Sequence, residues 1–192
     1  MAGVDQRALV ERARRGDHDA FAELTRASVV ALDRTARLIV RDPELARDAV
    51  QDALLRAWRD LPGLREADRF DAWIRRLTVN ACLDQSRRRR RRVTEVELRP
   101  FHDPPIADPM RGLADRDQVD RILRGLDERE RAIVVLHYYL GLPLTEVAAT
   151  LGIPVGTAKS RLHRALGLLR VALGADSEVS TPAPGIAGGQ PA

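Results

Sequence analysis

The chain has 192 residues, of which 44% are hydrophobic and 31% charged, and its formal net charge is +4. This length allows one or two domains with a hydrophobic core, and no apolar run approaches the ~20 residues that a membrane-spanning helix needs. The single cysteine, Cys82, excludes an internal disulfide, and the first residues lack the apolar segment of a secretion signal. The sequence therefore predicts a cytoplasmic protein without membrane insertion.

Alanine, leucine and arginine dominate the composition, and all three favour helices. Runs of β-branched and aromatic residues bounded by turns, which are typical of strands, are few. We therefore expect an all-α protein. Its first two helices are predicted over residues 4–15 and 20–40, with Asp17 or Asp19 capping the second. Pro43 suits the first turn of the next helix.

The predicted helix over residues 44–61 is amphipathic, with an apolar side of alanines, Val50 and leucines. Its other side carries Asp48, Gln51, Asp52 and Arg59, and Leu55 lies among these polar residues. A leucine within an exposed acidic face suggests a docking surface for another protein. A solvated face with one exposed leucine explains the pattern equally well, so both interpretations stay open at this point.

Residues 62–69 are turn formers and charged residues, which predicts a loop. The next helix is predicted over residues 70–88, with Trp73 in its core stripe and Cys82 as a small core residue. Six consecutive arginines, residues 87–92, follow at its end. Because adjacent cations repel one another, this run favours binding of a polyanion, although a disordered arm is the alternative.

Residues 93–112 are rich in proline and acidic residues and show no helical period, which predicts a flexible linker. The chain then divides into two small helical domains, residues 4–92 and 113–173. Helices are expected over residues 115–125 and again from Asp127. The final segment, residues 174–192, is rich in Ala, Gly, Pro and Ser and is predicted to be disordered.

Residues 144–170 are predicted to form two helices joined by a tight turn at Gly152, with Thr145 capping the first helix. The second helix has an apolar stripe of Ala158, Leu162, Ala165 and Leu169. Its other sides carry short hydroxyls and basic groups: Thr157, Lys159, Ser160, Arg161, His163 and Arg164. This arrangement is typical of a helix-turn-helix that reads the DNA major groove, although an ordinary hairpin with a solvated basic face shares the pattern.

Three stretches together resemble the extracytoplasmic-function sigma factors, a group of the sigma-70 family. ELARDAVQDALLRAWRDL, residues 44–61, resembles the helix of sigma region 2 that docks on RNA polymerase. FDAWIRRLTVNACLDQSRRRRR, residues 70–91, resembles the part of region 2 that opens and reads the −10 element. LDERERAIVVLHYYLGLPLTEVAATLGIPVGTAKSRLHRAL, residues 126–166, resembles region 4, which reads the −35 element. The resemblance covers about residues 5–173.

The resemblance implies specific roles for the residues that match these motifs. The polymerase-binding positions are Asp48, Gln51, Asp52 and Leu55. The −10 positions lie in the loop of residues 62–69, which would capture an extruded base, and in the helix beneath it. They are Arg65 and Arg69 in the loop, and Asn80, Asp84, Arg87 and Arg88 in the helix. The −35 positions are Thr157, Lys159, Ser160, Arg161, His163 and Arg164.

The expected function is therefore that of a sigma factor that binds core RNA polymerase, duplex −35 DNA and single-stranded −10 DNA. Such relatives are often inhibited by an anti-sigma factor, which the resemblance suggests as a further partner. The alternative is a stand-alone helix-turn-helix regulator that binds DNA without polymerase. An enzyme, a cofactor or a metal site is not expected, because the chain lacks a Gly-rich phosphate loop, a nucleophile motif and metal-spaced His or Cys residues.

Overall fold

A computed structural model describes residues 6–95 and 123–179, with the side chains of residues 92–95 and 172–179 outside that description. Within these ranges every regular element is helical, which confirms the predicted all-α class. The first unit comprises α1 (Gln6–Arg14), α2 (His18–Val40), α3 (Pro43–Asp60), η1 (Leu61–Gly63), η2 (Ala67–Arg69) and α4 (Phe70–Glu95). The second comprises α6 (Glu128–Val134), the π-helical η3 (Val135–Tyr139), α7 (Leu144–Leu151) and α8 (Val155–Val179). None of the described helices is both long and apolar enough to cross a bilayer.

Side-chain caps set the starts of the helices in the first unit. The Asp17 carboxylate accepts a hydrogen bond from the Ala20 backbone N–H at 2.9 Å, which confirms Asp17 rather than Asp19 as the cap of α2. Asp42 accepts from the N–H groups of Glu44 and Leu45 at 3.0 and 3.1 Å, and Pro43 occupies the first turn of α3. Each cap satisfies backbone donors that the helix cannot pair internally.

The second unit begins with a reciprocal cap and turns on a glycine. The Asp127 carboxylate accepts from the Glu130 N–H, while the Glu130 carboxylate accepts from the Asp127 N–H, which is a capping box. Gly152 has a φ of +63° and ends α7 in the left-handed conformation. The N–H groups of Gly152 and Ile153 then donate to the carbonyls of Ala149 and Ala148, which is a Schellman motif. The predicted turn at Gly152 is confirmed.

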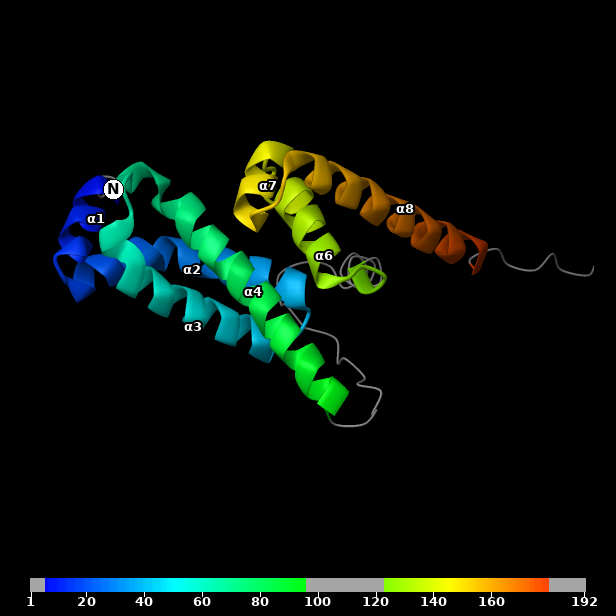
Figure 1. Cartoon of the computed structure of the whole chain (residues 1–192), viewed down its shortest axis with the longest axis horizontal. Helices are drawn as coiled ribbons and strands as arrows, with labels where there is room; N and C mark the ends of the chain where they lie inside the picture. The colour runs from blue at the N-terminus through cyan, green and yellow to red at the C-terminus, as the bar shows by residue number, and fades with distance from the viewer. Residues whose placement is uncertain (1–5, 96–122, 180–192) are drawn as a thin grey trace, which may run out of the picture.

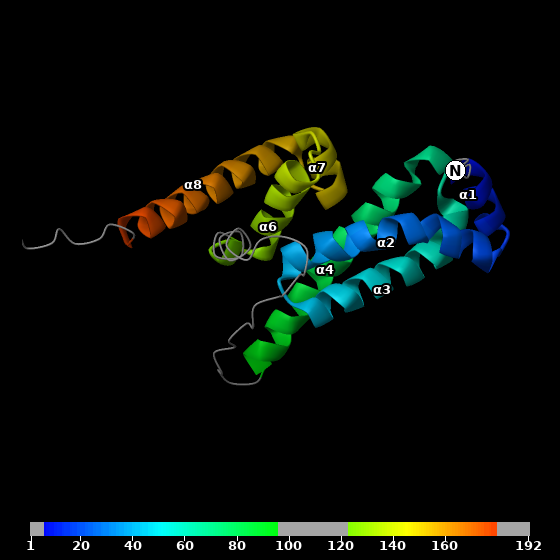
Figure 2. The same cartoon turned by 180° about the vertical axis from the view of Figure 1, so that it is seen from behind.

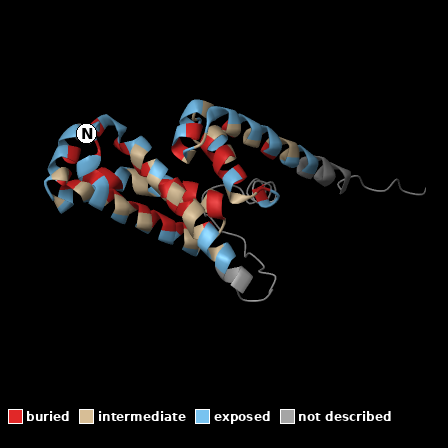
Figure 3. Ribbon diagram, in the orientation of Figure 1, coloured by how far each residue is buried: buried red, intermediate tan, exposed pale blue. Residues whose placement is uncertain are grey.

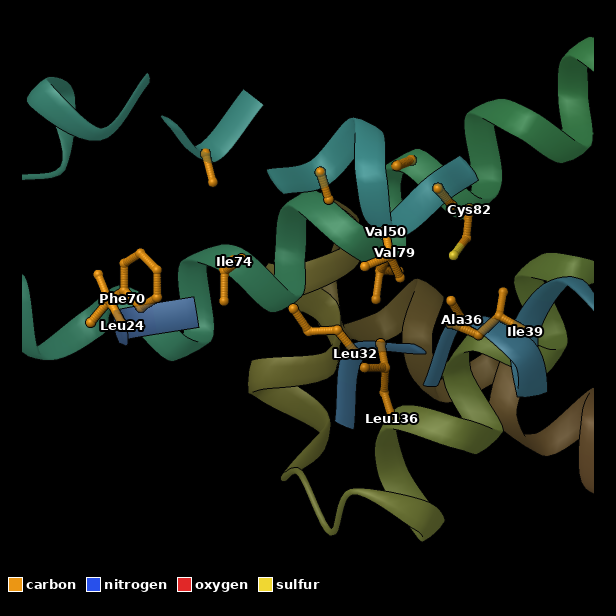
Figure 4. Packing of buried hydrophobic residues seen from close by; sticks show 14 of the residues in the cluster. Leu24, Leu32, Ala36, Ile39, Val50, Phe70, Ile74, Val79, Cys82 and Leu136 are labelled. Atoms are coloured by element: carbon orange, nitrogen blue, oxygen red, sulfur yellow. The ribbon is translucent and has the colours of Figure 1, made fainter. Parts of the chain in front are cut away.

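The two predicted domains are both present, and they pack against each other. In Figures 1 and 2 the bundle of α1–α4 lies at one side of the molecule and α6–α8 at the other, and α8 begins beside α7 and extends away from the bundle. Helix α6 contacts α2 and α4, and α7 contacts α4. One hydrophobic core runs through the contact, because Ile133, Leu136 and Val147 of the second unit cluster with residues of α2 and α4. Figure 4 shows Leu136 in the same part of the core as Leu32.

A buried arginine reinforces this contact between the units. Arg131 of α6 is only 7% exposed, and its Nε donates to the Ile39 carbonyl of α2 at 2.7 Å. Its Nη1 donates to the Leu126 carbonyl at 3.0 Å, and Glu128 lies 3.6 Å from its Nη2. Ile39 is near the end of α2, where carbonyls lack partners within the helix and carry partial negative charge. Desolvation of the guanidinium lowers the pKa of Arg131 from its ordinary value.

Several predicted boundaries differ from the structure. Thr145 does not cap α7, because the helix begins at Leu144 after Pro143 and Thr145 lies inside the first turn. The predicted loop of residues 62–69 contains η2 and the last two residues of η1, which begins at Leu61. Helix α4 continues to Glu95, so the arginine run is helical rather than a disordered arm, and α8 continues to Val179, beyond the predicted end at residue 173. The remainder of the predicted linker, from residue 96, and of the tail, from residue 180, lies outside the described residues.

Replacing Gly152 with alanine is expected to reduce the free energy of unfolding by about 1–2 kcal/mol, because an L side chain is strained at positive φ. A Cβ added there meets no atom within 4 Å, so the cost arises from the backbone and not from a clash. Gly167→Ala is the matched control, since that glycine lies within α8 at ordinary φ, and it should stabilise the protein by roughly 0.5–1 kcal/mol. Equal effects of the two substitutions in denaturant unfolding would contradict this assignment.

Candidate functional site

The basic face of α8 remains accessible although the two units pack together. Lys159, Ser160, His163 and Arg164 are exposed, and Thr157 and Arg161 are half-buried. Ala158 and Ala165, on the apolar stripe of the same helix, are buried as predicted. Figure 3 shows exposed residues along α8 and buried residues concentrated where the helices meet. The face predicted to read −35 DNA is therefore formed on a single helix and is open to a duplex.

Arg164 differs from the other cations of this face because it has fixed acidic partners. Its Nε donates to Oε1 of Glu130 at 2.7 Å, and its Nη2 lies 3.9 Å from Oδ2 of Asp127. Glu130 is 4% exposed, whereas the Arg164 side chain is 63% exposed. A buried carboxylate on α6 thus joins the start of that helix to the predicted recognition helix.

The predicted −10 positions on α4 share one face of the helix. Asn80, Asp84, Arg87 and Arg88 follow at spacings of four, three and one residues, which places them on one side. Asp84 forms an ion pair with Arg87 and lies 3.5 Å from Nη1 of Arg56 on α3. The half-buried Asp84 carboxylate is therefore held between two arginines on neighbouring helices.

The loop arginines lie away from that face. Arg65 and Arg69 are exposed, and Nε of Arg69 is 2.7 Å from the Glu66 carboxylate. Phe70 begins α4, so Asn80 lies ten residues further along the helix, about 15 Å from the loop at 1.5 Å per residue. The structure therefore places four of the predicted −10 residues on one face of α4 and leaves Arg65 and Arg69 in the segment before that helix, so the six do not form a single small pocket.

Among the described side chains of the run 87–92, Arg89 and Arg90 have partners on other helices. Nη1 of Arg89 is 2.9 Å from the Asp42 carboxylate at the start of α3. Arg90 forms an ion pair with Glu128 at the start of α6, which is a second polar link between the units. Arg87, Arg88 and Arg91 are exposed. The run therefore contributes both to the packing of the helices and to an accessible basic surface.

The predicted polymerase-binding face of α3 is largely accessible. Asp48 and Gln51 are exposed, and the Leu55 side chain is 63% exposed, which is unusual for a large apolar residue. Asp52 is half-buried and accepts a hydrogen bond from Nε2 of Gln85 on α4 at 3.2 Å. Asp52 thus fixes α3 against α4, while Leu55 presents an unpartnered apolar side chain.

Sequence reasoning missed the roles of Glu130 and Arg131. The Asp-x-x-Glu spacing at residues 127–130 could have revealed the capping box, but no local pattern marks a buried arginine or the pairing of Glu130 with Arg164. The interpretation of Cys82 as a core residue is confirmed, since it is fully buried. Desolvation raises the pKa of its thiol to about 12, so it is a poor nucleophile at neutral pH.

Comparison with known proteins identifies the family. Residues 24–92 match the family Sigma-70 region 2, and residues 116–169 match Sigma-70, region 4. An RNA polymerase sigma-E factor of Streptomyces avermitilis is 37% identical over 150 residues, which cover 78% of this chain and 83% of that protein. The ECF RNA polymerase sigma factor SigM of Mycobacterium tuberculosis is 38% identical over 160 residues, which cover 83% of this chain and 80% of that protein.

Solved structures give the same result. CnrH, solved in complex with the cytosolic domain of CnrY, is 30% identical to this chain and superposes with a TM-score of 0.64. The alignment covers 90% of this chain and 99% of the CnrH chain. The sigma factor RpoE of Bartonella quintana, solved in complex with the anti-sigma factor NepR, is 26% identical with a TM-score of 0.66, covering 81% of this chain and 98% of RpoE. Because relatives above 30% identity align along most of their length, the chain belongs to the extracytoplasmic-function sigma factors of the sigma-70 family.

Proposed function

We propose that this sigma factor binds core RNA polymerase and directs it to promoters by reading duplex −35 DNA with α8 and holding single-stranded −10 DNA along α4. The observation that carries the proposal is the presence of three separate accessible surfaces on one chain. These are the basic face of α8, the arginine-rich face of α4 and the outer face of α3 around Leu55. The chemistry of each surface suits a different partner: base edges and phosphates, an unpaired strand, and an apolar protein surface.

In this proposal the protein acts by binding alone, and RNA polymerase performs the covalent chemistry. Its place of action is the cytoplasm, where polymerase and promoter DNA are found. Because the structural relative RpoE was solved with an anti-sigma factor, we also expect an inhibitory protein to bind this chain. No residue is assigned to that partner.

Reconstitution with core RNA polymerase tests the proposal. The purified full chain should confer transcription in vitro from promoters found by sequencing the transcripts that its overproduction induces. Absence of binding to core polymerase would refute the proposal. The stand-alone regulator is distinguished by a mobility shift: it would bind its duplex equally well without polymerase, whereas a sigma factor needs core polymerase for stable promoter binding.

Binding of both promoter elements at once would hold the basic face of α8 and the face of α4 at two distant sites on the DNA. The −35 and −10 elements lie roughly 25 base pairs apart, which is about 85 Å at 3.4 Å per base pair. In the structure described here Nε of Arg131 lies 2.7 Å from the Ile39 carbonyl of the other unit. We therefore expect the interface between α6, α2 and α4 to open when the protein joins polymerase on a promoter.

Arg161→Ala is expected to weaken promoter binding by the holoenzyme by about 1–3 kcal/mol, with the loss concentrated at one base pair of the −35 element. Arg161 is half-buried at the edge of the apolar stripe, so its position on α8 is constrained by packing. Arg170→Ala removes the same charge about two and a half turns further along the helix, on its other side, and serves as the control. Filter binding across single-base variants gives the measurement, and an equal loss on every sequence would indicate phosphate contact instead.

A further inference from the structure

The Glu130 carboxylate is held in place from two directions. Its Oε2 accepts from the Asp127 N–H at 2.9 Å, which is half of the capping box at the start of α6. Its Oε1 accepts from Nε of Arg164 on α8 at 2.7 Å. Glu130 is 4% exposed, so this carboxylate has little access to water and depends on these two partners. Its position is therefore fixed by the fold before any ligand arrives.

This arrangement determines which atoms of Arg164 remain available. A guanidinium has five N–H donors in a rigid plane, and here the Nε donor is used by Glu130. The side chain is nevertheless 63% exposed, and the Asp127 carboxylate is 3.9 Å from Nη2, beyond an ordinary hydrogen bond. Among the described contacts Nη1 has no partner and Nη2 has only this long ion pair, so both terminal nitrogens keep N–H donors for a pair of adjacent acceptors.

We propose that Glu130 is a positioning residue for promoter recognition, which orients Arg164 so that its two terminal nitrogens contact the O6 and N7 acceptors of one guanine in the −35 element. An arginine that is ordered before binding loses less side-chain freedom when it reaches the base. Lys159, Arg161 and His163 have no comparable buried carboxylate among their described contacts. Arg164 is therefore the cation of this face whose side chain the fold orients most fully. This inference rests on the proposed function.

The test compares variants of the full chain bound to core RNA polymerase on a duplex promoter library randomised in the −35 region. Glu130→Gln keeps an acceptor for the capping box, because glutamine also serves at that position, but it removes the charge that holds Arg164. We expect it to weaken binding to the selected sequence about 10-fold, with the loss concentrated at one guanine. In a double variant with Arg164→Ala, the Glu130 substitution should add no further loss.

Glu128→Gln is the matched control, since Glu128 lies on the same turn and pairs with Arg90 and Arg131 rather than Arg164. It should leave the preference for that guanine unchanged. Arg164→Lys provides a second test that leaves α6 intact: it keeps the charge without the planar fork, so it should weaken the guanine preference, although less than Arg164→Ala does.

Three results would overturn the inference: undiminished binding by Glu130→Gln, an equal loss on all sequences, or losses that add in the double variant. Retention of the guanine preference by Arg164→Lys would also overturn it. Failure of the underlying function looks different, because the wild-type chain would then select no sequence from the library with core polymerase.

Discussion

Arg131→Ala is expected to lower the free energy of unfolding by about 3 kcal/mol, because it removes a buried charged donor from two short hydrogen bonds. The Ile39 and Leu126 carbonyls, now 2.7 and 3.0 Å from the guanidinium, would lose their donor in a site with little access to water. Glu128 would also lose a nearby positive charge. Urea unfolding followed by circular dichroism measures the change.

Arg129→Ala is the appropriate control for this substitution. Arg129 lies on the same helix, carries the same charge and is exposed, so its loss should change the free energy of unfolding by less than about 0.5 kcal/mol. A similarly small effect of Arg131→Ala would show that water or other groups satisfy the two carbonyls. In that case Arg131 would not be a principal link between the two units.

Leu55→Asp is expected to weaken binding to core RNA polymerase at least 30-fold, or about 2 kcal/mol, while leaving the fold unchanged. The side chain is 63% exposed in the free protein, so the substitution removes little packing within the chain. At an apolar contact with polymerase it would instead bury an unpaired charge, which is costly. Surface-based binding assays with purified core enzyme give the affinity.

Val30→Asp tests whether this effect is specific to the outer face of α3. Val30 lies on α2 and is 58% exposed, so it offers a matched apolar-to-acid change at a position with no predicted partner. Its affinity for polymerase should remain within a factor of two or three of the wild type. Equal loss in both variants would indicate a general effect of negative charge, and equal retention would remove Leu55 from the predicted polymerase contact.

The helix boundaries that sequence predicted best are those with local causes. Asp17, Asp127 and Gly152 act on backbone groups within a few residues, so their roles follow from side-chain chemistry and spacing alone. Thr145 shows where this reasoning failed. A hydroxyl near a helix start favours a cap, but Pro143 and Leu144 begin the helix earlier and place Thr145 inside it.

The sequence predicted which residues form the functional surfaces, but it did not predict which other residues those side chains contact. Periodicity placed Ala158 and Ala165 in the core and left the basic positions of α8 outside, and the structure confirms that division. Periodicity could not show which basic side chain of α8 forms an ion pair with an acidic residue far away in the sequence. Arg164 pairs with a residue 34 positions away in the chain, and its partner belongs to another helix.

By itself, the sequence determined that the described chain is helical, where most helices begin and turn, and which side of each helix is apolar. Only the tertiary structure decided what covers those apolar sides, and it joined the two units through one core and through Arg131, which donates to a carbonyl 92 positions away. The physical reason is that hydrogen bonds within a helix are local, whereas the burial of a face depends on whichever element packs against it. The same limit concealed Glu130, whose capping role is local but whose hold on Arg164 exists only after α6 and α8 have packed.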